Sequence, residues 1–177
     1  MLSLGEALLD TRNYAGVMAV ITALVSSPIN RLQNSWTPSL RRKLTLLWER
    51  MTNDKFTYVP YHLLVAALIA NQASWENNTF IPFLTRTGGE VLRLQGLAER
   101  SGWDTFHKDG LINISFLSDL WRAVEPVKIA QARPPNQSSV ITCYPVLLSL
   151  LDAPLPPMDK LMDLLYDLSV KLEPLKQ

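Results

Sequence analysis

The sequence predicts an all-α domain. Apolar residues recur every three or four positions in several segments, which is typical of helices with one buried face. Pairs of a hydroxyl residue and proline stand between these segments, and such pairs commonly begin helices. No stretch of useful length alternates apolar and polar residues as a half-buried strand would. The 177 residues suffice for one domain with a sizeable core, and we expect about eight helices in it.

Two proline corners divide the first half of the chain into helices. Ser27 is a candidate cap for a short helix that Pro28 begins, and Thr37 has the same place before the next helix. Asn53-Asp54 should end that later helix, and the polar residues 71–78 should form a loop. The helices expected here span residues 14–25, 28–36, 38–51 and 60–68.

Glycine and proline set the expected helix boundaries in the second half. Gly88-Gly89 should interrupt the helical pattern that follows the apolar run at 80–84, and Ser101-Gly102 should break the next helix. Pro126 should kink or end the long amphipathic helix that begins near residue 114. Residues 140–151 are apolar on nearly all sides. The helices expected here span residues 91–97, 114–124 and 158–172.

Composition argues against a nucleic-acid-binding, disulfide-linked or membrane-spanning protein. The 17 basic and 16 acidic residues leave a formal net charge of +1, without the excess of basic residues typical of nucleic-acid-binding proteins. No apolar run reaches the roughly 18–20 residues of a transmembrane span, and the first residues lack the features of a signal peptide. The lone Cys143 excludes an internal disulfide and fits a reducing compartment, so we expect a cytoplasmic protein.

No set of residues predicts covalent catalysis, a metal site or a cofactor. His62 and His107 lie far apart without Cys/His ligand spacing, and there is no glycine-rich phosphate-binding loop. Cys143 lies among apolar residues, where a buried thiol is the simpler interpretation and a nucleophile is the alternative. Glu90 and Glu99 are either an acid/base pair or part of a solvated helix face. We therefore expect a binding or regulatory function, with no cofactor.

Residues 13–36 read NYAGVMAVITALVSSPINRLQNSW: an asparagine, an apolar helix, a Ser-Pro corner, Arg-Leu and then an aromatic residue. This segment resembles the catalytic domain of Ras-family guanine-nucleotide exchange factors, the RasGEF or Son-of-sevenless-like domain, although a helix–proline–helix corner alone is common. FIPFL at 80–84, GLINISFL at 110–117 and YDLSVKLEP at 166–174 resemble family segments in the same order. The resemblance covers residues 10–175. The matching positions in its first segment are Asn13, Ser27, Pro28, Arg31, Leu32 and Trp36.

The resemblance implies an irregular multi-helix fold and a regulatory function. Residues 1–177 would form a single partial domain, the C-terminal two-thirds of the family domain, because that domain begins well before Asn13 and its N-terminal helices are missing here. The family releases GDP from small GTPases by inserting a helical hairpin, without covalent chemistry or a cofactor. The implied partner is a Ras-like GTPase, with an adaptor protein as a second class. The GTPase would recruit the chain to the inner membrane surface.

The resemblance also implies roles for individual residues. Phe83 and Leu84 would bind the GTPase, and Leu92 would be the hairpin's apolar wedge, by an ungapped count from Pro82. Packing in the core is the alternative for both Phe83 and Leu92. The residues implied to be structural are Asn13, which would bind backbone groups at a helix start, Arg31, which would pair within the domain, and Pro28 and Leu32.

The hairpin segment departs from the family pattern and leaves two hypotheses open. Gly96 stands where the family has an acidic residue, and Glu90 or Glu99 would replace that residue only if the hairpin shifted its register. The first hypothesis is a guanine-nucleotide exchange factor, or a fragment of one. The second is a non-catalytic RasGEF-like scaffold that binds a GTPase or a signalling partner without driving exchange.

Overall fold

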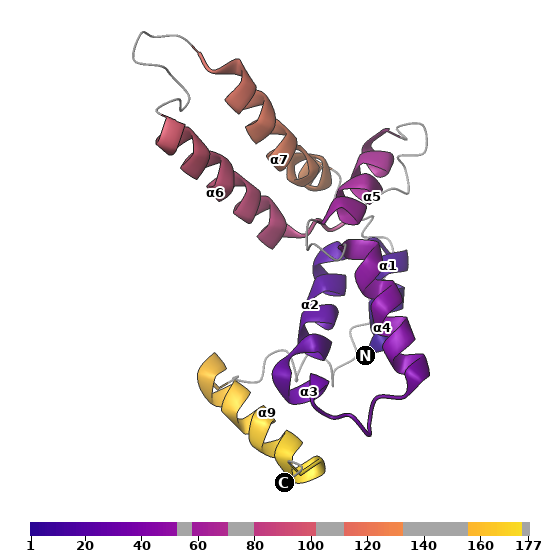
Figure 1. Ribbon diagram of the computed structural model, residues 1–177. Helices are drawn as coiled ribbons and strands as arrows, with labels where there is room; N and C mark the ends of the chain where they lie inside the picture. The colour runs from indigo at the N-terminus through magenta and orange to yellow at the C-terminus, as the bar shows by residue number, and fades with distance from the viewer. Residues whose placement is uncertain (53–57, 71–79, 102–111, 133–155, 175–177) are drawn as a thin grey trace.

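The computed structural model describes residues 1–52, 58–70, 80–101, 112–132 and 156–174 (Figure 1). Within these ranges the chain is helical, and it forms no strand apart from isolated bridge residues, as between Asn13 and Ile81. The prediction of an all-α fold is therefore confirmed. The described helices are α1 (Leu2–Asp10), α2 (Tyr14–Val25), α3 (Ser27–Asn30), α4 (Pro38–Met51), α5 (Val59–Ala70), α6 (Leu84–Ser101), α7 (Ile114–Ala132) and α9 (Met158–Leu172).

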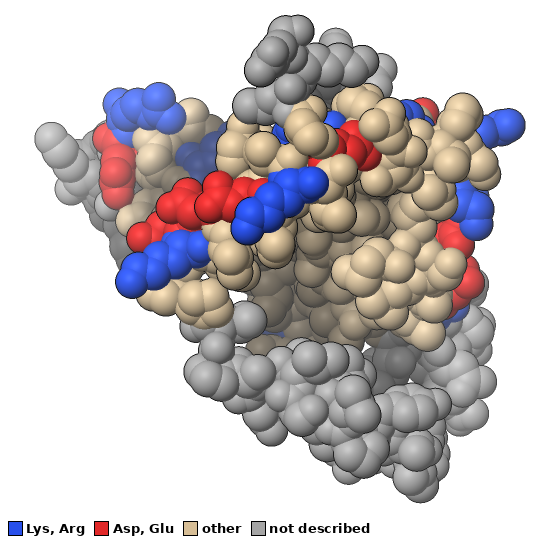
Figure 2. Space-filling model, turned by 90° about the horizontal axis from the view of Figure 1, so that it is seen from below, with Lys and Arg blue, Asp and Glu red and all other residues tan. Residues whose placement is uncertain are grey.

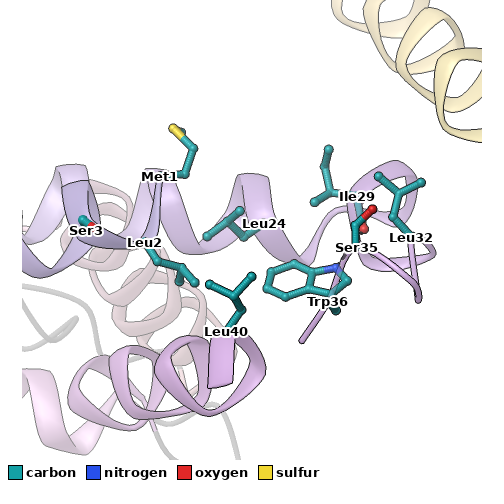
Figure 3. Close-up of a pocket in the computed structure, with 9 residues that line it drawn as sticks. All are labelled: Met1, Leu2, Ser3, Leu24, Ile29, Leu32, Ser35, Trp36 and Leu40. Carbon is teal, nitrogen blue, oxygen red and sulfur yellow. Dashed lines mark hydrogen bonds between the residues drawn. The ribbon is translucent and has the colours of Figure 1, made fainter. Parts of the chain in front are cut away.

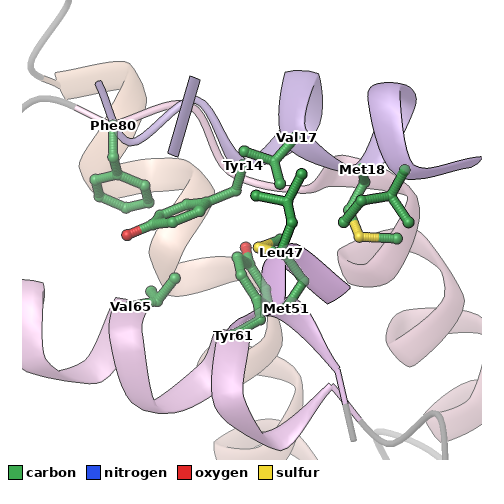
Figure 4. Packing of buried hydrophobic residues seen from close by; sticks show 9 residues of the cluster. Tyr14, Val17, Met18, Leu47, Met51, Tyr61, Val65 and Phe80 are labelled. Atoms are coloured by element: carbon green, nitrogen blue, oxygen red, sulfur yellow. The ribbon is translucent and has the colours of Figure 1, made fainter. Parts of the chain in front are cut away.

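The helices α1, α2, α4 and α5 pack together around one hydrophobic core (Figure 4). The central helix α2 is apolar on nearly every side, and its neighbours bury one face of it, where both Val17 and Ile21 are 0 % exposed. Burial of such side chains is the main term that stabilises a domain of this size. The buried cluster comprises Tyr14, Val17, Met18, Ile21, Leu47, Met51, Tyr61, Val65 and Phe80.

The first helix, α1, is not among the helices that the sequence predicts. It is only nine residues long, shorter than the window of about 11–18 residues over which helical periodicity is recognised. Its Leu8 and Leu9 nevertheless pack against the core. Gly5 is buried where α1 meets α4, and a Cβ atom at this position would lie 2.6 Å from Leu47 Cδ2. A side chain at this position would therefore force the buried Leu47 side chain to move.

The Ser-Pro corner is tighter than predicted. Helix α3 spans only four residues, and its N-cap is Ser26 rather than Ser27, which already lies inside the helix. Trp36 lies beyond α3, and its indole Nε1 donates a hydrogen bond to the carbonyl of Ile29 at 3.1 Å. The second corner is as predicted: the Thr37 side chain accepts a hydrogen bond from the backbone N–H of residue 40 and caps α4.

In the second half one predicted break is wrong, and for Pro126 only the kink stays a prediction. Helix α6 continues across Gly88 and Gly89, although each glycine costs a helix about 1 kcal/mol relative to alanine. Helix α7 continues past Pro126 to Ala132, so this proline does not end it. The two long helices pack on each other, and this contact stabilises both despite their unfavourable residues. The Asn53-Asp54 pair, the loop at 71–78 and the apolar segment at 140–151 lie outside the described residues.

The described surface is mixed in character. Basic and acidic side chains lie close to one another, and uncharged residues separate these groups (Figure 2). This agrees with the formal net charge of +1. None of the described helices has the length and apolar character that crossing a lipid bilayer requires.

Candidate functional site

The candidate site is a hairpin made of α6 and α7, which projects from the body formed by α1, α2 and α4 (Figure 1). The side of α6 that is buried carries Leu94 and Ala98. At the start of α7, the Asn113 side chain accepts a hydrogen bond from the backbone N–H of Phe116 at 3.0 Å. Asn113 belongs to the GLINISFL segment, which therefore fixes where the second helix of the hairpin begins.

Backbone hydrogen bonds attach the base of the hairpin to the corner between α1 and α2. The N–H of Tyr14 donates to the carbonyl of Ile81 at 2.9 Å, and the N–H of Ile81 donates to the carbonyl of Arg12 at 3.0 Å. Arg12 has a left-handed backbone conformation, with φ of 58°. The Asn13 side chain accepts from the N–H of Gly16 at 2.9 Å and caps α2. Two segments that resemble the family, one around Asn13 and the other at 80–84, thus meet at this base.

An aromatic cluster supports the same base from the side of α5. The N–H of Phe83 donates to the Tyr61 hydroxyl at 3.1 Å, and the Phe83 ring lies 5.7 Å from that of Tyr58 and 6.4 Å from that of Tyr61. Phe83 is only partly buried in these contacts, so its packing role does not cover its whole side chain. Leu84, the next residue, is exposed.

Leu92 stands out from the middle of α6. Its side chain is 69 % exposed, which rules out the alternative that it packs in the core of the described structure. Gly88 lies one turn before it and Gly96 one turn after it, and Cβ atoms at these two positions would meet nothing within 4 Å. The helix surface directly one turn before and one turn after Leu92 therefore carries no side chain.

A cluster of charged residues connects α6 to α5 and was not predicted. The Nε of Arg86 donates to His62 Nε2 at 3.4 Å, and the Nη2 of Arg86 lies 3.0 Å from Glu90 Oε2. The Arg86 guanidinium also lies over the Tyr58 ring, 5.6 Å from its centroid. Glu90 accepts a further hydrogen bond from Arg93 Nε at 3.1 Å. Glu90 is thus neither one half of an acid/base pair with Glu99 nor a simply solvated residue.

These residues line a cavity of about 290 Å³ between α5, α6 and α7. Its other charged pair, Asp119 and Arg122, lies on α7 and is joined at 3.2 Å. Residues from α5, α6 and α7 therefore meet at one place, where α5 contacts the base of the hairpin. The residues that line the cavity are His62, Arg86, Glu90, Arg93, Asp119, Arg122 and Ala123.

Two titratable groups of this cavity, the imidazole of His62 and the carboxyl of Glu90, have shifted pKa values. Burial lowers the pKa of His62, and the neighbouring Arg86 lowers it further. The hydrogen bond from Arg93 and the charge of Arg86 hold the pKa of Glu90 below its ordinary value. At neutral pH Arg86 thus lies between a neutral imidazole, which accepts its hydrogen bond, and a carboxylate.

We expect the protein to become less stable as the pH falls through 6.5 and below. The folded pKa of His62 lies under its ordinary value of 6.5, so the unfolded chain binds the proton more readily than the folded one. The carboxylate of Glu90 adds nothing in this window, because its pKa is lowered from 4.5. Urea denaturation between pH 7.5 and 5.5 measures the effect. A His62→Gln variant, which keeps an acceptor for Arg86 but does not titrate there, should lose less stability over the same range; equal losses would contradict the assignment to His62.

A second polar cluster joins the Ser-Pro corner to α9. Arg31 Nη1 donates to Ser169 Oγ at 3.1 Å, and Nη2 donates to the carbonyl of Glu173 at 2.8 Å. The same guanidinium lies 5.8 Å from the centroid of the Tyr166 ring. Ser169 is one of the two buried polar residues among the described ones. Arg31 therefore holds the last helix against the corner.

The carboxylate of Glu173 binds the loop that follows α3. It accepts hydrogen bonds from the N–H of Asn34 at 3.1 Å and from the N–H and hydroxyl of Ser35 at 3.0 Å each. Partial desolvation raises the pKa of Glu173, but these hydrogen bonds outweigh it and hold the pKa below its ordinary value. We call Arg31, Ser169 and Glu173 the Arg31 clamp. The corner at 26–36 and the segment at 166–174 meet in it.

Comparison with known proteins identifies the family. A family model for the RasGEF domain matches residues 1–118, which is 118 of the 177 residues of the chain. The match extends from α1 to the start of α7 and ends before α9 and the YDLSVKLEP segment. No curated protein matches the chain. The roles of Phe83, Leu84 and Leu92 in binding a GTPase stay predictions. Because the match covers more than half of its residues, this chain belongs to the RasGEF domain family.

Proposed function

We propose that this protein promotes the release of GDP from a Ras-like small GTPase through its α6–α7 hairpin. The observation that carries the proposal is the exposed Leu92, on the outer surface of a hairpin within a chain that matches the RasGEF domain. Proteins of this family regulate GTPases and carry out no covalent chemistry. The GTPase would also bring this protein to the inner membrane surface, and an adaptor is a second class of partner.

The physical task is to weaken a very tight complex. A GTPase that binds its nucleotide with picomolar affinity gains about 16 kcal/mol from it. Part of this energy comes from contacts that switch loops make to the phosphates and Mg²⁺. A protein that binds the nucleotide-free GTPase more tightly than the loaded one shifts the equilibrium towards release. The glycines beside Leu92 allow the partner's backbone to approach α6 closely while the leucine side chain enters the space near the metal.

One observation favours the second function, a scaffold that binds without exchange. In the described helix α6, Gly96 stands where the family has an acidic residue near the wedge. The carboxylate of Glu90 is held by Arg86 and Arg93 and is only 20 % exposed. Glu99 accepts a hydrogen bond from Gln95 at 3.2 Å. If exchange needs a carboxylate that competes with phosphate, then the described part of α6 does not offer one at the position where the family has it.

Leu92→Ala should reduce exchange activity without a loss of stability. Removing an exposed side chain that becomes buried against the GTPase costs about 1.5–3 kcal/mol, so the acceleration should fall roughly 10- to 100-fold. The measurement is release of fluorescent GDP from Ras, Rap and Ral GTPases. The matched control is Leu97→Ala, which changes a leucine on the same helix that is 44 % exposed and should retain activity.

The same experiment separates the two functions. If the folded wild-type protein binds a GTPase but does not accelerate release at tens of micromolar, it acts as a scaffold and the exchange proposal is wrong. If both leucine variants lose the same fraction of activity, then the wedge is not at Leu92.

A further inference from the structure

Side chains, more than backbone packing, join the hairpin to α5. Among the described helices α6 packs closely on α7, whereas the backbones of α5 and α6 do not pack closely on each other. Helix α5 itself is held in the core by Tyr61 and Val65, which are 2 % and 3 % exposed. The side chains that bridge from α5 to α6 therefore connect the hairpin to the core, in addition to the backbone hydrogen bonds at Ile81.

Arg86 reaches from α6 to α5. Its Nε donates to Nε2 of His62 at 3.4 Å, and its guanidinium lies over the Tyr58 ring, 5.6 Å from the centroid. Glu90, one turn further along α6, orients this guanidinium, because its Oε2 atom is buried and lies 3.0 Å from Arg86 Nη2. The Arg86 side chain is thus held in one orientation, with its Nε directed at α5.

Tyr58, directly before α5, has an unusual backbone conformation. Its φ is 52°, a left-handed value that is uncommon for an aromatic residue. Its carbonyl accepts a hydrogen bond from the N–H of His62 at 3.0 Å, and its ring lies 5.7 Å from that of Phe83. Such a conformation persists only where surrounding contacts fix it, and the contacts of Tyr58 with Phe83 and Arg86 are among them.

His62 makes the connection between α5 and α6 sensitive to protons. The neutral ring offers Nε2 as an acceptor to Arg86, whereas a protonated ring has no free lone pair there and would place two cations 3.4 Å apart. Both carboxylates of the cavity already pair with arginines, so the protonated ring would not find a free carboxylate among them. The charged groups that line the cavity with His62 are Arg86, Glu90 and Arg93 on α6 and Asp119 and Arg122 on α7.

We propose that Arg86 is a positioning residue, which holds the hairpin against α5, and that protonation of His62 releases this hold. Leu92 lies six residues after Arg86 on α6, so the hold sets where the leucine stands relative to the body. A GTPase would meet a well-placed Leu92 near neutral pH and a displaced one in acid. The consequence for nucleotide release rests on the proposed function, whereas the hold on the hairpin does not.

The direct test measures the distance between two spin labels in the full chain by pulsed electron paramagnetic resonance. In a Cys143→Ser background the labels are attached through Thr22→Cys on α2 and Gln95→Cys on α6, two exposed positions. We expect one narrow distance distribution at pH 7.5 and a shifted, broader one at pH 5.5. The share of released hairpin should rise by at most about tenfold per pH unit below 6.5, the ordinary pKa of histidine.

Variants at the two residues separate the hold from general stability. Arg86→Met should give the acid distribution already at pH 7.5. His62→Arg, which carries a fixed charge at an exposed position, should do the same and decides the test if Arg86→Met fails to fold. His62→Gln keeps an acceptor and should keep the narrow distribution at both pH values.

The matched control is Arg41→Met, which should leave the distances unchanged. Arg41 also lies over an aromatic ring, 5.8 Å from the centroid of Trp36. Trp36, however, lines an apolar groove of about 330 Å³ that shares no residue with the cavity beside His62 (Figure 3). The control therefore removes the same kind of contact from the body without touching the hairpin.

Release of fluorescent GDP from a Ras-like GTPase gives the second measurement. The ratio of the wild-type rate to the His62→Gln rate cancels the pH dependence of the GTPase, and it should fall by up to about tenfold from pH 7.5 to 5.5. A constant ratio would refute the consequence for release.

Two results would overturn the inference itself. One is a distribution like that of the wild type at pH 7.5 for folded Arg86→Met or for His62→Arg. The other is equal broadening of the wild type and His62→Gln in acid. If the distances shift as expected but the wild type accelerates no release at any pH, then the exchange function is wrong and the hold on the hairpin stands.

Discussion

An Arg31→Ala variant is expected to lose about 2–3 kcal/mol of unfolding free energy, because a hydrogen bond to a charged group contributes about 1.5–3 kcal/mol and this residue is only partly buried. The substitution removes both bonds of the Arg31 clamp to α9 and the contact with the Tyr166 ring. It also leaves the buried hydroxyl of Ser169 with only its bond to the carbonyl of Tyr166. Urea denaturation measures the loss.

Two further variants test whether geometry or charge matters at this position. Arg31→Lys should recover only part of the stability, since an ammonium group cannot reproduce the planar fork that reaches two oxygen atoms. Arg42→Ala changes an exposed arginine on α4 and should leave the denaturation midpoint nearly unchanged. Limited proteolysis of Arg31→Ala should cut α9 first. A wild-type midpoint for Arg31→Ala would show that the clamp contributes nothing to stability.

An Ile21→Ala variant should cost about 2–5 kcal/mol, because the side chain is 0 % exposed at the centre of the core and its removal leaves a cavity. For a domain whose total stability is roughly 5–15 kcal/mol, this is a large fraction. Ile21→Val, which removes one methylene group, should cost about 0.5–1.5 kcal/mol. Thermal and urea denaturation of both variants give the comparison.

The matched control for this core substitution lies at the end of the same helix. Val25 on α2 is exposed, so Val25→Ala should change stability by less than about 0.5 kcal/mol. If Ile21→Ala and Val25→Ala lowered the midpoint equally, then α2 would not be the centre of the core.

The fold class and most helix positions follow from the sequence, because helical periodicity and capping are local properties. Thr37 illustrates this: a hydroxyl residue before a proline predicts a cap, and the structure shows one. The predictions that differ from the structure rest on local sequence rules, which tertiary contacts override. Gly88-Gly89 does not break α6, since the packing of α6 on α7 outweighs a weak propensity. Pro126 lies within α7 for the same reason.

Which residues meet in space was harder to predict. The sequence suggests that Arg31 pairs within the domain, yet its partners lie 138 and 142 positions away, and no local pattern identifies them. The contact between Arg86 and His62 spans 24 positions and two helices. Its only signal in the sequence is the i, i+4 spacing of Arg86 and Glu90, which is common on solvated helices.

The attachment at Ile81 also has a mechanical consequence. The two backbone hydrogen bonds that join this residue to Arg12 and Tyr14 make a pivot, and α6 is a rigid arm of 18 residues that starts three positions later. At 1.5 Å per residue the arm is about 27 Å long, so a rotation of about 10° at the pivot displaces its far end by about 5 Å. A small rotation at Ile81 thus displaces the far end of α6 by about the width of a side chain. Leu92 lies near the middle of this helix.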